Sequence, residues 1–315
     1  MNIIDKAIGA ISPEKGLKRA FARRQLEVLN SGYGEHGANS RKKSLLSFTA
    51  PGGSAKEDID QHADKLRRRS RELYCGGSSL ATAAIKTMRT NVIGRGLRLN
   101  PRIDAEALKI SPEKAAQIEK EICREFSLWA NSTACDIARR NNFAELQQLA
   151  FINWLLSGDV IAIFRQTTRP GMPYDLRIQL VEADRLSNPY GKTGYENIVE
   201  GIETNSDGEV VAYHICNNHP YSYSKQKSEW QRVEAFGKET GRPNVLFIGN
   251  DERIGQRRGV PFLAPIIADL KQVGRYTDSE LTAAVVASYF TLFIEKDTTR
   301  ICSIVCGLCC YSEKY

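Results

Sequence analysis

The side chains best suited to chemistry form small groups, and none of them completes a catalytic site. Glu182 and Asp184 lie two residues apart, so on a strand both carboxylates would share one face, as the ligands of some nuclease metal ions do. A solvated strand end is the commoner origin of such a pair. His214 and His219 could bind a metal ion, but no cysteine or carboxylate has the spacing to complete that site. A metal-dependent enzyme is therefore the weakest of three interpretations.

The nucleotide-binding and thiol motifs are also incomplete. Gly191-Lys192-Thr193 matches only the end of a phosphate-binding P-loop, because Leu186 stands where that motif needs another glycine. Four cysteines crowd into the last 14 residues, but their spacing matches no common zinc site and no histidine is near; they are Cys302, Cys306, Cys309 and Cys310. We expect no catalytic residues, no cofactor and no bound metal.

The basic side chains indicate a binding function more clearly than the groups above indicate catalysis. Arg257 and Arg258 are flanked by Gly255 and Gly259, so guanidinium groups and exposed backbone amides could contact phosphate there. A basic loop that caps the next helix or pairs with a neighbouring subunit explains the same residues equally well. The residues we expect to contact DNA or a partner are Arg257, Arg258, Arg67, Arg68, Arg69, Lys42 and Lys43.

Composition indicates an ordinary soluble protein with a basic N-terminal third. The 315 residues are 42% hydrophobic and 26% charged, with a net charge of +7. Residues 1–100 hold 19 Lys and Arg against 9 Asp and Glu, a net of +10, which leaves −3 for the rest. The basic third could meet nucleic acid, although a solvated basic arm has the same composition. We find no secretory signal and no apolar run long enough to span a membrane.

The periodicity of the sequence predicts an α+β fold in which helices precede a largely antiparallel mixed sheet. Helices are expected over 2–29, 58–74 and 80–92, then from Pro112 through Trp129, and over 143–156. Strands are expected over 97–100, 160–164, 176–181, 198–202, 210–215 and 245–248, with Asp207-Gly208 as a hairpin turn. Residues 31–54 are rich in Gly, Ser, Asn and Lys, and we expect a mobile arm that proteases cut first.

A long helix after the glycine-rich turn at 255–261 organises the rest of the chain. Its apolar residues recur at spacings of three and four: Leu263, Ile266, Ile267, Leu270 and Val273. We expect this helix to reach about Phe290. The segment 281–294 has no polar face and is too short to cross a bilayer, so we expect it to pack against protein.

Four segments follow from these patterns. They are a basic flexible arm over 1–57, an α+β domain over 58–250, a loop and long helix over 251–300, and an atypical Cys-rich tail over 301–315.

From Asn141 to about Lys296, several ordered motifs resemble the lambda-type family of phage portal proteins. They are Asn142-Phe143, Leu146-Gln147-Gln148-Leu149-Ala150-Phe151, Trp154-Leu155-Leu156-Ser157-Gly158-Asp159, Leu180-Val181-Glu182-Ala183-Asp184-Arg185-Leu186, and Gly255-Gln256-Arg257-Arg258-Gly259-Val260-Pro261. Tyr74, Gly94 and Gly96 fit the earlier part of the family. The order of several motifs is much more specific than any one of them.

The resemblance implies a portal-like fold, with 58–250 as a wing-like domain and 251–300 as the start of a stem-like region. It implies a ring, usually dodecameric, at one vertex of a tailed-phage head. Such a head–tail connector nucleates capsid assembly and passes double-stranded DNA during packaging and ejection. The implied partners are other copies of the chain, the terminase large subunit, capsid or scaffold proteins and head–tail joining proteins. The implied location is the virion portal vertex, after assembly in the host cytoplasm.

The chain departs from this family at its end. Portal proteins of this type continue well beyond the long helix, whereas this chain stops at Tyr315 after an abrupt change of composition at Ile301. We therefore expect a truncated prophage copy that forms poorly soluble aggregates. The alternative to a portal subunit is a free-standing basic nucleic-acid-binding protein, which salt-sensitive monomeric behaviour would indicate.

Overall fold

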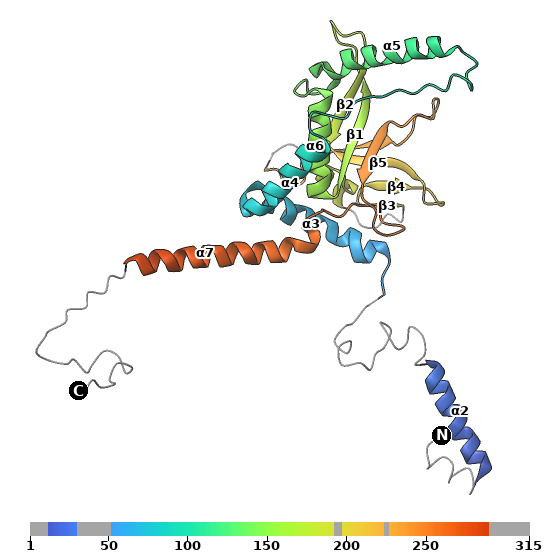
Figure 1. The fold of residues 1–315 in the computed structure, drawn as a ribbon, viewed down its shortest axis with the longest axis vertical. Coiled ribbons are helices and arrows are strands. Elements are labelled where there is room, and N and C mark those ends of the chain that lie inside the picture. The colour runs from blue at the N-terminus through green and yellow to red at the C-terminus, as the bar shows by residue number, and fades with distance from the viewer. Residues whose placement is uncertain (1–11, 30–51, 192–196, 224–226, 290–315) are drawn as a thin grey trace, which may run out of the picture. The chain divides into compact units, whose positions relative to one another are not determined.

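The structure is a computed structural model that describes residues 12–29, 52–191, 197–223 and 227–289. Its contacts divide the chain into two compact units, Met1–Ser54 and Ala55–Tyr315. In the first unit, the structure describes helix α2 (Pro13–Leu29) (Figure 1). Lys42, Lys43 and most of the expected mobile arm lie outside the described residues, as does the Cys-rich tail.

The helices of the second unit begin and end where local sequence signals predict. They are α3 (Gln61–Glu72), α4 (Ser79–Val92), α5 (Pro112–Ala130) and α6 (Phe143–Ser157). At the start of α5 the Ser111 hydroxyl accepts a hydrogen bond from the Lys114 amide. Asn142 and Glu145 form a reciprocal capping box at the start of α6. The predicted helices over 58–74, 80–92, 112–129 and 143–156 are thus confirmed within a few residues.

The strands form two antiparallel sheets. The first has the order β2-β1-β7, from β2 (Leu176–Val181), β1 (Asp159–Gln166) and β7 (Val245–Gly249). The second has the order β3-β4-β5-β6, from β3 (Ile198–Val199), β4 (Ile202–Thr204), β5 (Val210–Cys216) and β6 (Trp230–Glu234). In the first sheet Ile161 is opposite Val181 on one side and Phe247 on the other. The α+β class predicted from the sequence is confirmed.

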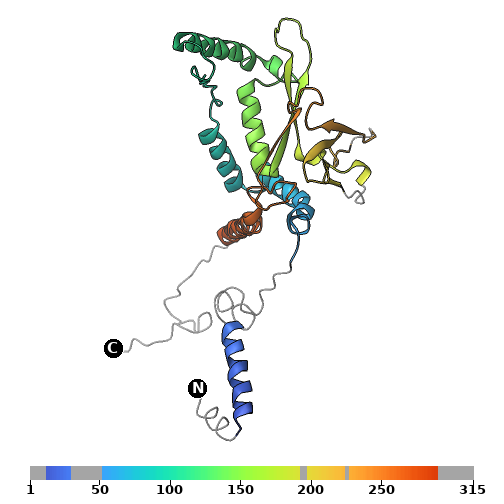
Figure 2. The same ribbon diagram turned by 90° about the vertical axis from the view of Figure 1, so that its right-hand side faces the viewer.

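The central strand β1 is buried on both faces. Ile161 and Ile163 join residues of the second sheet, such as Tyr213, in one hydrophobic cluster. Ala162 points the other way and packs with Leu146 of α6. The first sheet is therefore covered by the second sheet on one face and by α6 on the other (Figures 1 and 2). A third cluster joins the end of α6 to α4 and to the residues around Leu263.

One predicted strand is wrong, and one strand of the structure was not predicted. Residues 97–100 alternate like a half-buried strand, but they have no strand partner among the described residues. Leu97 and Leu99 are instead 61% and 43% exposed. Strand β6 was not predicted, because Gln231, Arg232 and Glu234 give it a polar composition. The Asp207-Gly208 turn between β4 and β5 is confirmed.

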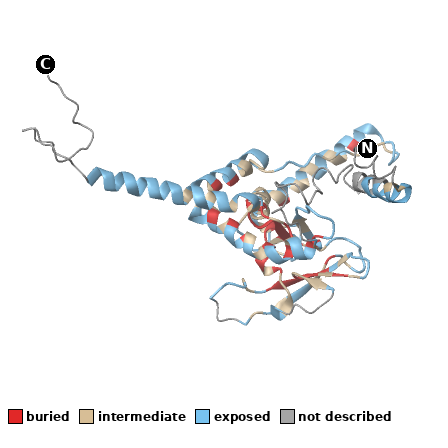
Figure 3. Cartoon of the chain, turned by 90° about the horizontal axis from the view of Figure 1, so that it is seen from below, coloured by how far each residue is buried: buried red, intermediate tan, exposed pale blue. Residues whose placement is uncertain are grey.

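The long helix is present as α7 (Ile267–Tyr289), after a short 3₁₀ turn over Ala264–Ile266. Ile267 and Leu270 pack against the cluster that contains Leu263. The rest of the described helix is exposed (Figure 3). Leu281 and Tyr289 are 61% and 81% exposed, so the described part of 281–294 is not packed within the single chain. Its packing against other protein stays a prediction, and residues 290–294 lie outside the described residues. Among the described residues, no helix is both long enough and apolar enough to cross a membrane.

Candidate functional site

The glycine-rich turn before α7 lies directly against the junction of α6 and β1. A Cβ atom on Gly259 would come within 1.9 Å of the Gly158 carbonyl oxygen, and one on Gly158 would come within 2.3 Å of the Gly259 carbonyl carbon. Gly158 also ends α6 with φ of 85°. Farther on, the Phe262 amide donates to the Leu155 carbonyl over 2.8 Å. Two backbones therefore touch at a point where only glycine fits.

Asp159 and Arg258 form a fully buried ion pair at this junction. The Asp159 carboxylate accepts from Arg258 Nε at 2.7 Å and from a terminal guanidinium nitrogen at 3.1 Å, and it also accepts from the Gly259 amide. The remaining guanidinium N–H groups donate to the carbonyls of Ala183, Leu186 and Glu200. All five donors of the arginine are thus satisfied, as burial of a charge requires.

Burial and the neighbouring Asp159 shift the pKa of the Arg258 guanidinium in opposite directions. Burial alone would lower its pKa, but the Asp159 charge and hydrogen bonds hold the pKa above its usual value. The contacts with Asp159 therefore favour the charged form of Arg258 despite its burial.

Helix α3 brings a second buried arginine and a buried acid to the same place. Arg67 Nε lies 3.3 Å from Asp184 Oδ1, and a terminal nitrogen of Arg67 lies 3.9 Å from Asp159. Burial, followed by the nearby Arg258 charge, lowers the pKa of Arg67. Asp60, just before α3, accepts from the amide of Arg258, and its burial raises the pKa of its carboxyl although the amides oppose this.

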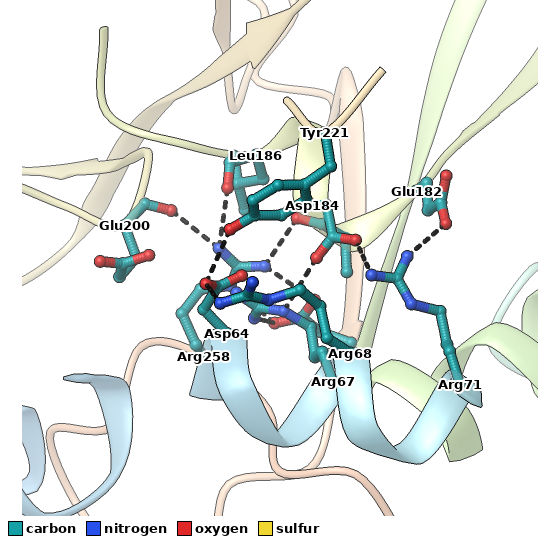
Figure 4. A network of polar contacts seen from close by, with 12 residues as sticks. Asp64, Arg67, Arg68, Arg71, Glu182, Asp184, Leu186, Glu200, Tyr221 and Arg258 are labelled. Atoms are coloured by element: carbon teal, nitrogen blue, oxygen red, sulfur yellow. Dashed lines mark hydrogen bonds and ion pairs between the residues drawn. The ribbon is translucent and has the colours of Figure 1, made fainter. Parts of the chain in front are cut away.

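The same helix continues the network outward. Arg71 forms ion pairs with both Glu182 and Asp184, which follow β2 (Figure 4). Asp184 is 1% exposed and so shares two arginines from successive turns of α3. We call Asp60, Arg67, Arg71, Asp159, Asp184 and Arg258 the junction network. It ties α3, β1, the end of β2 and the turn before α7 into one unit.

A short loop after β5 closes over the outer end of this network. His219 Nε2 lies 3.1 Å from Asp184, and the Tyr221 hydroxyl donates to Asp64 over 2.8 Å. The Tyr221 ring also stacks on the Arg68 guanidinium, with 4.6 Å between the guanidinium carbon and the ring centroid. The loop is therefore held on α3 by polar and cation–π contacts, as Figure 4 shows for Tyr221 and Arg68.

The structure brings together a possible metal triad that the sequence could not assemble. Ligand atoms of Glu182, Asp184 and His219 all lie within 4.8 Å of one another. The expectation that no carboxylate is placed to complete a site around His219 is therefore wrong. However, the Arg71 guanidinium already spans both carboxylates, and it supplies the positive charge that a cation would bring. A metal ion would have to displace Arg71, so the geometry favours an ion-pair cluster.

The turn before α7 is ordered by one buried side chain, Gln256. Its carbonyl oxygen accepts from the amides of Glu252 and Arg253, and its amide donates to the carbonyls of Asn250 and Arg258. One side chain thus satisfies four backbone groups of the turn. The loop is accordingly a defined structure and holds Arg258 at a fixed position.

The seven basic residues expected to contact DNA or a partner separate into three groups. Arg258 and Arg67 are fully buried, so the expectation that they are presented at the surface is wrong; buried carboxylates hold them inside. Arg257 is half-buried, and Arg68 and Arg69 are exposed on α3. Lys42 and Lys43 lie outside the described residues. The surface role stays a prediction for Arg68, Arg69 and Arg257.

Sequence reasoning did not pair these arginines with their acids, although it singled out Asp184 as a possible metal ligand. Asp159 is 99 residues from Arg258, and Asp184 is 117 residues from Arg67, so no local pattern pairs them. One usable signal existed. Asp159 directly precedes the apolar run of β1, where a charge is buried unless a cation meets it.

Comparison with known proteins assigns the family. The model of the lambda family of phage portal proteins matches residues 41–301. The chain belongs to this family. The match includes the whole junction network and every described residue of α7, so the resemblance of the motifs around 142–159 and 255–261 is confirmed.

Two curated relatives are portal proteins. The chain is 21% identical over 267 residues to portal protein B of Escherichia phage lambda, covering 84% of this chain and 49% of that protein. It is 19% identical over 255 residues to the portal protein of Escherichia phage N15, covering 80% and 47%. The chain thus spans about half the length of the curated relatives it matches.

A solved structure described as the neck of an empty GTA particle, computed with C6 symmetry, is also similar. Its sequence identity is 14% and its TM-score is 0.35, over 72% of this chain and 46% of that one.

Proposed function

We propose that this chain is a subunit of a phage portal, a ring of identical copies at one vertex of the head. The observation that carries this proposal is the family match over residues 41–301. In this role the ring passes double-stranded DNA during packaging and ejection. Its partners are the terminase large subunit, capsid or scaffold proteins and head–tail joining proteins.

The junction network is consistent with a mechanical role in such a subunit. A ring that guides DNA needs its long helix at a fixed angle to the rest of the subunit. Here the turn before α7 is held by the Gly158–Gly259 contact, the Asp159–Arg258 pair and the Gln256 hydrogen bonds. Buried ion pairs contribute little net stability, but in some proteins they favour one arrangement over its alternatives. We infer that this network sets the angle at which α7 leaves the subunit.

The direct test of the proposal is self-association of the purified chain. Size-exclusion chromatography with light scattering, followed by electron microscopy, should find assemblies of many copies at low and at high salt. Closed rings among them would show that the expectation of poorly soluble aggregates is wrong. A monodisperse monomer whose affinity for duplex DNA falls steeply with salt would contradict the proposal. That result would favour the free-standing nucleic-acid-binding alternative, which the basic N-terminal third motivates.

A matched pair of variants tests the role of the network. Arg258→Ala should destabilise the fold of the subunit as well as its assembly, because it removes the cation that hydrogen-bonds the buried Asp159. Arg69→Ala should leave the fold intact, because the side chain is exposed on α3. If both variants assembled like the unmodified chain, the network would have no part in building the ring.

A further inference from the structure

A cavity of about 330 Å³ lies on the far side of α6 from the second sheet, away from the junction network. Three elements line it: the extended segment 95–99, the C-terminal half of α5 and the first two turns of α6. The segment runs from α4 to α5 along the side of the unit (Figures 1 and 2). It is the stretch whose strand-like alternation found no strand partner among the described residues.

The wall of this cavity is fixed in place. Gly96 has φ of 100°, and a Cβ atom there would come within 2.6 Å of Ala144 Cβ. The Leu97 amide donates to the side-chain oxygen of Gln147, and Gln148 donates to the Gly94 carbonyl. The extended segment is therefore held on α6 by side chains rather than by a sheet. Such a preformed wall reduces the entropy that a ligand must offset on binding.

The floor of the cavity is aromatic. Phe126 and Phe143 meet edge to face, with ring centroids 5.6 Å apart, and Trp129 lies behind them at 5.7 Å from Phe126. Phe126 and Phe143 are only half-buried, whereas Trp129 is 7% exposed. Leu97 and Leu99 stand exposed on the same segment. An apolar side chain of a partner can therefore be covered on several sides.

The rim of the cavity is strongly basic. Residues 86–102 contain five cations and no Asp or Glu. Two of the cations, Arg95 and Arg98, line the cavity and are exposed. Within the described part of the chain, neither has an ion-pair partner. The nearby acids of α5 are already engaged, because Glu119 accepts from the Ile103 amide and Glu125 pairs with Arg124.

We propose that this cavity docks an acidic segment of a partner protein, with one aromatic or aliphatic side chain anchored on Phe126 and Phe143. The aromatic floor is complementary to an apolar group, and the exposed Arg95 and Arg98 are complementary to flanking carboxylates. Duplex DNA could pair with the basic rim of the cavity. It could not fill the aromatic floor, because it has no projecting apolar side chain. This inference does not rest on the portal proposal, since it needs only the folded single chain.

A peptide titration tests the docking site. The probe is a short fluorescein-labelled peptide in which acidic residues flank a single phenylalanine, titrated with the full chain and followed by fluorescence anisotropy. We expect saturable binding that weakens at least tenfold when alanine replaces the phenylalanine, and that disappears when lysines replace the acids. A loss of tenfold corresponds to about 1.4 kcal/mol, within the range of one interface anchor.

Matched variants of the chain locate the binding. Arg98→Glu should weaken it at least tenfold, while Arg102→Glu makes the same charge change outside the cavity lining and should change it less than about twofold. Ser127→Trp should block the cavity, whereas Leu128→Trp adds the same ring at the next, exposed position of α5, outside the lining. Thermal melting confirms that each variant folds.

Three results would overturn the proposal. They are absence of saturable peptide binding, binding that is equal in Arg98→Glu and Arg102→Glu, and displacement of the peptide by duplex DNA as effectively as by unlabelled peptide. The last result would assign the rim to a nucleic-acid surface.

Discussion

Arg258 shows how burial decides what an arginine can do. Arginine is almost never fully buried without a partner, so a sequence with Arg257 and Arg258 between glycines predicts exposed cations. In the structure Arg258 is 0% exposed because Asp159, 99 residues away, meets it. Its neighbour Arg257 is half-buried. Two adjacent arginines thus have different environments, and the sequence could not separate them.

Arg258→Ala should lower the free energy of unfolding by about 3–5 kcal/mol, because it removes the hydrogen-bonded partner of the buried Asp159 and leaves only the more distant Arg67, 3.9 Å away. Arg258→Lys should recover only a small part of this, since one ammonium cannot reach the three carbonyls that the guanidinium binds. Urea unfolding followed by Trp fluorescence measures both. Arg257→Ala is the matched control and should cost less than about 1 kcal/mol. Equal losses for the two alanine variants would contradict the structural role of Arg258.

Glu203 on β4 should make the free energy of unfolding depend on pH. Hydrogen bonds from Arg232, and then from His214, lower the pKa of its carboxyl to about 2 even though partial burial opposes them. A carboxyl with a lowered folded-state pKa stabilises the fold above its unfolded pKa, near 4.5, and loses that contribution as the pH falls toward 2. We expect Glu203 to contribute on the order of 2 kcal/mol at neutral pH after solvent screening.

The variant Glu203→Gln measures that contribution. Its free energy of unfolding should be lower than that of the unmodified chain at neutral pH, and the two should converge as the pH falls from 4.5 to 2. Glu209→Gln, on an exposed turn of the same sheet, controls for the loss of one charge. A constant difference between the two chains across this range would show that Glu203 does not act through its charge.

Some elements could be predicted from local sequence signals, whereas others depend on contacts with a neighbouring element. Helices α5 and α6 were predicted well because their caps and apolar stripes lie within the helix itself. The strand expected over 97–100 was wrong because alternation does not guarantee a neighbouring strand. Strand β6 was missed for the opposite reason, since β5 supplies its hydrogen bonds and its own residues are polar. The junction network combines residues from four separate elements, so no local sequence pattern could predict it.

Gly259 lies where the turn before α7 contacts the α6–β1 junction, so we expect a side chain at this position to lower stability. Gly259→Ala should destabilise the chain severely, because the new Cβ would lie 1.9 Å from backbone that cannot move without breaking the Asp159 contacts. Gly274→Ala, within α7, has nothing within 4 Å and should be neutral or stabilise by up to about 1 kcal/mol. Thermal melting of the two variants measures the difference. Similar melting temperatures would mean that the two backbones are not in contact.

Over the whole molecule, the described residues show a buried core and a helix that leaves it. The core is formed by two sheets and the helices around them, whereas α7 contains no buried residue. Apart from Ile267 and Leu270, which pack against the cluster around Leu263, its apolar side chains are largely exposed in the single chain. Large apolar side chains that stay exposed along one helix indicate an interaction surface. In a portal subunit, we infer that its partner is another copy of the chain.

Substitutions on the outer part of α7 should therefore separate assembly from folding. Leu281→Lys with Val285→Lys removes two apolar side chains that are 61% and 52% exposed. We expect self-association to weaken at least tenfold, because charges would then have to be buried between copies, while the melting temperature of the monomer changes little. Thr282→Lys with Ser279→Lys adds the same charge at polar positions of the same stretch of helix and should weaken association less. Sedimentation velocity across a dilution series measures the effect. Equal association of both double variants would mean that copies meet through another surface, and a large fall in melting temperature would mean that this part of α7 packs within its own chain.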